Sequence, residues 1–79
     1  MNLSPKELEV LALVALGYSD KEIGKKLNIK YGTVRTHINR IILKLNARNR
    51  GHAVFAFFLR YPEWLSTFTQ KYENLINIT

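Results

Sequence analysis

The sequence predicts an all-α fold of four helices with an additional C-terminal amphipathic helix. Two segments carry the Ser-x-x-Glu pattern of a capping box, which marks a helix start, and apolar residues recur at spacings of three and four. Seventy-nine residues are enough for one small core, and without cysteine no disulfide supports it. We therefore expect one domain over residues 1–61, followed by a helical extension over residues 62–79.

The first helix is predicted to begin at the capping box Ser4-Pro5-Lys6-Glu7. The Ser4 hydroxyl accepts from the Glu7 amide, the Glu7 carboxylate accepts from the Ser4 amide, and Pro5 suits the first helical position. Gly17 is a typical residue for ending such a helix. Because apolar residues surround most of its circumference, we expect it to be central and buried. These residues are Leu8, Val10, Leu11, Leu13, Val14 and Leu16.

A helix-turn-helix is predicted at about residues 19–45. Ser19 and Glu22 repeat the capping box and open a short helix that Asn28 can end. A longer helix follows over roughly residues 31–45, and two capped helices joined by so tight a turn are typical of this motif. At 100° per residue, the apolar residues of the longer helix form one narrow seam toward the core. They are Val34, Ile38, Ile41 and Leu45.

The opposite face of the longer helix is polar and basic. It carries Arg35, Thr36, Asn39 and Arg40, which are residue types that contact base edges and phosphates. Residues 21–50 hold nine basic side chains and one acidic one, a net charge of +8 in a chain whose total is +6. Such a block indicates a polyanion partner, nucleic acid before membrane, while a merely solvated basic surface is the alternative on charge alone.

Asn49 is predicted to cap a fourth helix from Arg50 to Arg60, which stops before Pro62. Apolar residues encircle this helix, so its second face needs a cover. The tail carries apolar residues at helical spacing, and we expect a fifth helix at about residues 62–77 to provide that cover, within one chain or across a dimer. The residues expected in dimer or tail packing are Phe55, Phe58, Leu59, Trp64 and Phe68.

Several segments resemble, in the same order, the LuxR-type (GerE-like) DNA-binding domain. They are LSPKELEVL, GYSDKEI, LNI, TVRTH and NR followed by AV. The resemblance covers about residues 3–60. It implies a four-helix domain that binds duplex DNA, dimerises through its last helix and regulates transcription in bacteria.

The resemblance also implies roles for particular residues. The family's base-reading positions correspond to Arg35, Thr36 and Asn39, which also lie on the polar face given by the helical angles. Lys21, Thr33 and Lys44 match positions that touch or approach phosphates in the family. We expect further phosphate contacts from the remaining polar residues of the motif, namely Lys25, Lys30, Tyr31 and Arg40.

The chain departs from the family pattern at informative positions. Lys30 stands where a Ser usually caps the recognition helix, so about 1 kcal/mol of capping is given up. Gly24 replaces an Ala, which permits close helix approach but costs up to about 1 kcal/mol in a helix. We also predict a buried ion pair between Glu7 and Arg50. For His37, a phosphate contact and a packing role are both open.

The function expected from these features is sequence-specific duplex DNA binding by a dimeric bacterial transcription regulator. The alternatives are promoter recognition like that of a sigma factor region, or a protein-interaction module on the same fold. The partners considered are duplex DNA, a second copy of the chain and RNA polymerase. No nucleophile–base pair stands out, so no enzyme is expected, nor a cofactor, metal or small-molecule ligand. Because no apolar run exceeds seven residues, we expect no membrane association and a cytoplasmic location.

Overall fold

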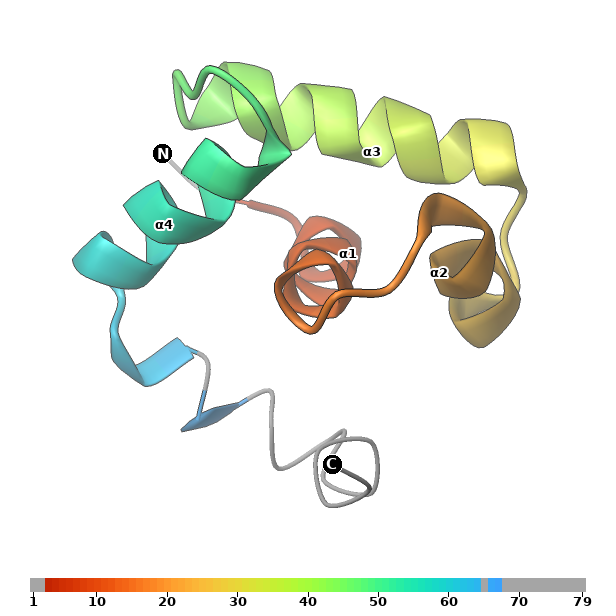
Figure 1. Ribbon diagram of the computed structural model, residues 1–79, viewed down its shortest axis with the longest axis horizontal. Coiled ribbons are helices and arrows are strands. Elements are labelled where there is room, and N and C mark those ends of the chain that lie inside the picture. The colour runs from red at the N-terminus through yellow and green to blue at the C-terminus, as the bar shows by residue number, and fades with distance from the viewer. Residues whose placement is uncertain (1–2, 65, 68–79) are drawn as a thin grey trace.

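The computed structural model describes residues 3–64 and 66–67 of the chain. Its helices are α1 (Pro5–Ala15), α2 (Asp20–Leu27), α3 (Tyr31–Lys44) and α4 (Arg50–Arg60). In Figure 1, α1 is seen end-on at the centre, α3 lies across the top, and α2 and α4 flank α1 on opposite sides. The predicted all-α fold is confirmed, and each of the four helices forms where the sequence indicated.

Helix α1 is the centre of the core because four successive residues of it are buried. Its start has the predicted capping box, with the Ser4 amide 2.8 Å from Glu7 Oε1 and the Glu7 amide 3.1 Å from Ser4 Oγ. The chain leaves α1 through Gly17, whose φ of 91° is a conformation that favours glycine. The buried apolar residues are Val10, Leu11, Ala12, Leu13, Ile23, Val34, Ile38, Ile41, Ala53, Phe57 and Trp64.

The turn between α2 and α3 is tight. Asn28 ends α2 in the left-handed conformation, with φ 56° and ψ 47°, and the Ile29 amide donates to the Gly24 carbonyl at 2.9 Å. A Cβ on Gly24 would lie 2.8 Å from the Ile29 carbonyl oxygen, which is closer than real Cβ contacts come. Gly24 therefore allows the close approach that the sequence suggested. Lys30 precedes α3 without any side-chain cap, as its replacement of a serine predicted.

Trp64, in the described residues that follow α4, belongs to the core. Asn49 caps α4 as predicted, accepting from the His52 amide at 2.8 Å. Beyond α4 the Trp64 ring meets the Phe57 ring edge to face, with centroids 4.9 Å apart, and Trp64 is only 7% exposed. Phe68 and most of the predicted fifth helix lie outside the described residues.

The predicted ion pair between Glu7 and Arg50 is wrong. Glu7 instead pairs with Lys44, whose Nζ lies 2.8 Å from Glu7 Oε1, and Arg50 pairs with both carboxylate oxygens of Asp20. The start of α1 therefore lies against the end of α3, and the long Arg50 side chain reaches from the start of α4 to Asp20 at the start of α2. The sequence shows which helices carry charge, but it does not show which helix ends meet.

Candidate nucleic-acid interface

The outer face of α3 presents the predicted base-reading residues together. Arg35, Thr36 and Asn39 are exposed, whereas Val34, Ile38 and Ile41 of the apolar seam are buried and Leu45, just past the helix, is half-buried. Leu43 continues this outer face toward the end of α3 and is 79% exposed, although the sequence reasoning gave it no role. The helix therefore separates a core-facing apolar side from a solvent-facing polar side, as the helical angles predicted.

Two of these residues already have partners within α3. Arg35 Nη1 donates to the Tyr31 hydroxyl at 3.0 Å, and the Arg35 guanidinium carbon lies 5.8 Å from the centroid of the Tyr31 ring. Thr36 Oγ1 donates to the Gly32 carbonyl at 3.0 Å. The Thr36 hydroxyl proton is thus used within the helix, and the oxygen keeps acceptor capacity for a donor on a base.

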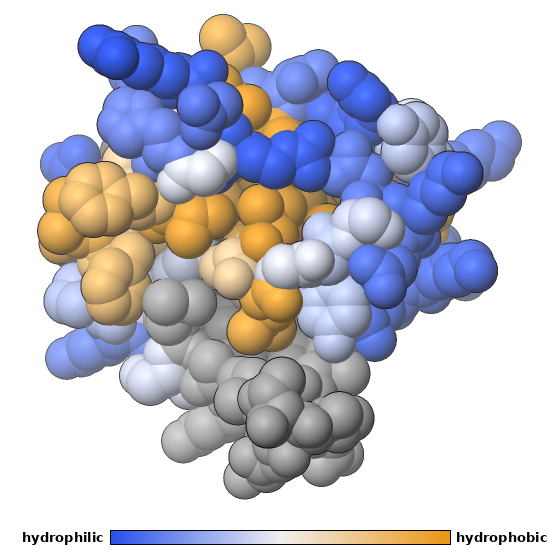
Figure 2. Space-filling view, in the orientation of Figure 1, coloured by the Kyte–Doolittle hydropathy of each residue, from blue (hydrophilic) through white to orange (hydrophobic). Residues whose placement is uncertain are grey.

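Most residues predicted to contact phosphates are exposed around the helix-turn-helix. Lys21 and Lys25 lie on the solvent side of α2, and Lys30 lies at the start of α3. The remaining members of this group on α3, Tyr31, Thr33 and Arg40, are exposed as well. Figure 2 shows hydrophilic side chains gathered over α2, on the side of the molecule opposite α4. The motif therefore brings cationic side chains of two helices to the solvent.

Lys44 has a different environment from the other predicted phosphate contacts. It lies at the far end of α3, where its ammonium group meets the carboxylate of Glu7, whose side chain is 4% exposed. Burial alone would raise the pKa of Glu7, but hydrogen bonds from Lys44 and the Ser4 amide, together with the Lys44 charge, lower it. In the free chain, the Lys44 charge is thus directed toward the core.

The acidic residue Asp20 interacts electrostatically with one of the predicted base-reading residues. Asp20, at the start of α2, has its pKa lowered by hydrogen bonds from Arg50, against the opposing effect of burial. The charges of Arg50 and Arg35 lower this pKa further. The sequence reasoning missed the contacts of Arg35, although the four-residue spacing between Tyr31 and Arg35 is a signal that could have found the first of them.

Helix α4 exposes a second apolar face, which we call the α4 stripe: Phe55, Phe58 and Leu59. Their exposed fractions are 58%, 39% and 64%. They are spaced three and four residues apart, so they lie on one side of the helix, while Ala53 and Phe57 face the core. Figure 2 shows a hydrophobic patch over α4, on the left. The described part of the tail, with Trp64, packs on Phe57 and leaves this stripe exposed.

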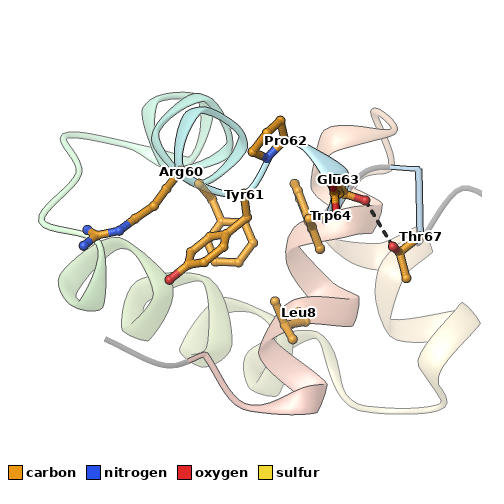
Figure 3. A pocket seen from close by; sticks show the side chains of 8 residues that line it. Leu8, Arg60, Tyr61, Pro62, Glu63, Trp64 and Thr67 are labelled. Atoms are coloured by element: carbon orange, nitrogen blue, oxygen red, sulfur yellow. Dashed lines mark hydrogen bonds between the residues drawn. The ribbon is translucent and has the colours of Figure 1, made fainter.

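A pocket of about 500 Å³ lies where α1, the end of α4 and the tail meet. Figure 3 shows its wall, in which the Thr67 hydroxyl donates to the Glu63 carbonyl at 3.1 Å. No residue predicted to contact DNA lines it, so it is separate from the polar face of α3. The lining residues are Leu8, Phe57, Arg60, Tyr61, Pro62, Glu63, Trp64 and Thr67.

The sequence of this chain matches the model of a known protein family. The model of the family described as bacterial regulatory proteins, luxR family, matches residues 1–57, which include α1, the whole helix-turn-helix and most of α4. This chain belongs to the LuxR family. The resemblance seen in the sequence is thereby confirmed.

Curated relatives of this LuxR-family chain are named as transcriptional or response regulators. The transcriptional regulatory protein LnrK of Bacillus subtilis (strain 168) is 43% identical over 61 residues, which are 77% of this chain and 27% of the relative. DesR of the same strain is 50% identical over 52 residues, 66% of this chain and 26% of the relative. The response regulator protein VraR of Staphylococcus aureus (strain NCTC 8325 / PS 47) is 41% identical over 56 residues, 71% of this chain and 27% of the relative.

This LuxR-family chain thus spans about a quarter of the length of the curated relatives it matches. The family and the relatives' names support DNA-binding transcription regulation, which is not an enzymatic class. Within residues 3–64 and 66–67, no helix combines the length and hydrophobicity needed to cross a bilayer.

Proposed function

We propose that this chain is the sequence-specific DNA-binding domain of a bacterial transcription regulator and that α3 enters the major groove. The observation that carries the proposal is the two-sided character of α3. Its apolar residues Val34, Ile38 and Ile41 are buried, so the helix is fixed on the core while Arg35 and Asn39 project into solvent. A helix held in this way can present side chains to base edges with a defined orientation.

Phosphate contacts supply the affinity in this proposal. The exposed cations Lys21, Lys25 and Lys30 lie on α2 and at the start of α3, and Arg40 lies on α3 itself. When such groups neutralise phosphates, condensed counterions are released, so binding weakens steeply as salt rises. These contacts hold the domain on the duplex and orient it without selecting a sequence.

Base contacts supply the specificity. Arg35 offers a two-donor fork for guanine O6 and N7, and Asn39 offers a donor and an acceptor for adenine N6 and N7. Each such pair contributes roughly 1–3 kcal/mol of discrimination against the wrong base. Thr36 lies between them in the sequence, and its hydroxyl oxygen can accept from a base while its O–H group donates to the Gly32 carbonyl.

The α4 stripe is proposed as the contact with a second copy of the chain. Phe55 and Leu59 are each more than half exposed, and burying such a contiguous apolar surface is favourable. A two-fold dimer carries two copies of α3, so we expect two half-sites about 10 bp apart, or a multiple of that spacing.

Site selection from random duplex DNA with the full 79-residue chain tests the DNA-binding proposal. We expect one preferred duplex, bound more weakly as salt is raised. Arg35→Ala should lose roughly 1–3 kcal/mol on that duplex and relax the choice of base at one position. Arg48→Ala is the matched control, because it removes the same charge from an exposed residue outside α3 and should keep the sequence preference. No preference over bulk competitor DNA would contradict the proposal.

Sedimentation equilibrium of the chain, free and on its selected duplex, tests the dimer. Leu59→Glu places a charge in the α4 stripe and should yield a monomer. Leu43→Glu is the matched control, because Leu43 is at least as exposed but lies on α3, and it should leave the association of the free chain unchanged. A native chain that is monomeric in both states would contradict the proposed dimer.

A further inference from the structure

We propose that Tyr31 is a positioning residue for Arg35, which it holds so that one edge of the guanidinium stays open toward a guanine. This inference rests on the proposed function, because it concerns how the base-reading face of α3 is prepared before DNA arrives. It assigns Tyr31 a role beyond the phosphate contact that the sequence suggested.

The contact between the two side chains has two parts. Arg35 Nη1 donates to the Tyr31 hydroxyl at 3.0 Å, and the guanidinium lies near the aromatic ring, 5.8 Å from its centroid. The residues are four apart on one helix, so their side chains are neighbours on the same helix surface. Both side chains are exposed, and Tyr31 is 46% accessible to solvent.

The contact leaves the base-reading capacity of Arg35 intact. Among the described residues, the hydrogen bond of Arg35 uses only Nη1, so the Nε and Nη2 donors remain available for a bidentate pair. Guanine presents O6 and N7 as neighbouring acceptors in the major groove, which this pair of donors matches. Tyr31 thus occupies one side of the guanidinium and leaves another free.

A second attraction acts on the same guanidinium. Asp20 is held in place by Arg50 of α4, and the Arg35 charge is close enough to lower the pKa of the Asp20 carboxyl. The Arg35 head group is therefore hydrogen-bonded to an aromatic hydroxyl on its own helix and is also attracted by the charge of the Asp20 carboxylate. An exposed arginine without such partners samples many rotamers, and ordering it on DNA opposes binding.

The consequence is a specific effect on base choice. Removing the Tyr31 hydroxyl should weaken discrimination at the base read by Arg35 and leave the salt dependence of binding unchanged. A phosphate contact from Tyr31 would have a different effect, because its loss would lower affinity for all sequences alike. The salt slope would also fall if the Tyr31 hydroxyl helps to hold a cation on a phosphate.

The DNA experiment compares the native chain with Tyr31→Phe on the selected duplex and its single-base variants. Arg35→Ala first identifies the guanine that Arg35 reads. We expect Tyr31→Phe to reduce discrimination at that position about three- to tenfold, the size of one hydrogen bond, and to have no further effect in the Arg35→Ala background. Tyr18→Phe is the matched control, because it deletes a hydroxyl near the same motif, where the ring lies beneath Lys26.

A second measurement needs no DNA. In the free chain, the NMR order parameter of the Arg35 Nε–H group should exceed that of Arg48, fall in Tyr31→Phe and stay unchanged in Tyr18→Phe. An equally mobile Arg35 in the native and Tyr31→Phe chains overturns the positioning role and leaves the proposed function standing. Equal losses of affinity on every duplex, in both Arg35 backgrounds, also overturn it in favour of a phosphate contact. If no duplex is preferred at all, the proposed function fails and the inference falls with it.

Discussion

Replacing Lys44 by methionine tests how the ends of α1 and α3 are joined. Methionine keeps an unbranched stem and removes the charge that meets Glu7 at 2.8 Å. The Glu7 carboxylate is then left 4% exposed, with the Ser4 amide as its remaining partner at 2.8 Å. Because burial raises the pKa of Glu7 and Lys44 opposes that effect, the pKa should rise in the variant.

The expected cost at neutral pH is about 2 kcal/mol of unfolding free energy, the range for losing a hydrogen bond to a charged group. Since the Lys44 side chain is 40% exposed, solvent screens part of the interaction and keeps the figure below that of a fully buried pair. For a domain of this size, 2 kcal/mol corresponds to a fall in Tm of roughly 8–16 °C.

Urea unfolding at pH 7 measures the effect, with Lys25→Met as the control because Lys25 is exposed on α2. The control should change stability by less than about 0.5 kcal/mol. Double-mutant cycles decide the pairing: Glu7→Gln should couple to Lys44→Met and not to Arg50→Met. Coupling of Glu7 to Arg50, with none to Lys44, would refute the pairing described here.

The same Lys44→Met variant reports on DNA. If the Lys44 charge stays with Glu7 in the complex, the slope of log affinity against log salt is unchanged on the selected duplex. If Lys44 turns to a phosphate, as the family resemblance predicted, the slope falls by about 1.

Three other predictions concern stability. Because the pKa values of Glu7 and Asp20 are lowered in the fold, their ionisation stabilises the fold at pH values above their ordinary pKa values of 4.5 and 3.8. The unfolding free energy should therefore drop as pH falls below about 4.5 and continue to drop through the lowered pKa values. A flat urea midpoint from pH 5 to pH 2 would contradict this. Gly24→Ala should lower the unfolding free energy by about 1 kcal/mol net, because crowding against the Ile29 carbonyl outweighs the gain in helix propensity. An unchanged or higher urea midpoint would count against that contact. Lys30→Ser should raise the unfolding free energy by about 1 kcal/mol, because serine can cap α3. The same substitution should lower the slope of log affinity for DNA against log salt by about 1. An unchanged slope would exclude Lys30 as a phosphate contact.

Features encoded by neighbouring residues could be predicted from the sequence. The capping boxes at Ser4 and Ser19 depend on residues three positions apart, and the end of α2 depends on the tolerance of Asn28 for a left-handed conformation. The division of α3 into a buried seam and an exposed polar face follows from helical geometry alone. These local rules therefore gave the four helices and the location of the candidate interface.

Contacts between distant residues could not be derived in this way. The ion pairs of Glu7 and Arg50 depend on which helix ends meet, and helical periodicity carries no information on that packing. Trp64 packs on Phe57, which lies on the core face of α4 and not on the α4 stripe. The bond from Arg35 to Tyr31 is local, yet several rotamers compete for so long a side chain, so only the structure selects it.

The contact between Gly24 and Ile29 brings the backbone of the turn close to α2. The Ile29 amide bonds the Gly24 carbonyl, while the Ile29 oxygen occupies the space that a larger residue at position 24 would need. Backbone atoms therefore limit how closely the turn can approach α2, and substitutions on the exposed helix faces do not touch this contact. Under the proposed function, a new target preference would arise by exchanging exposed side chains on the outer face of α3, with no change in the turn that joins α2 to α3.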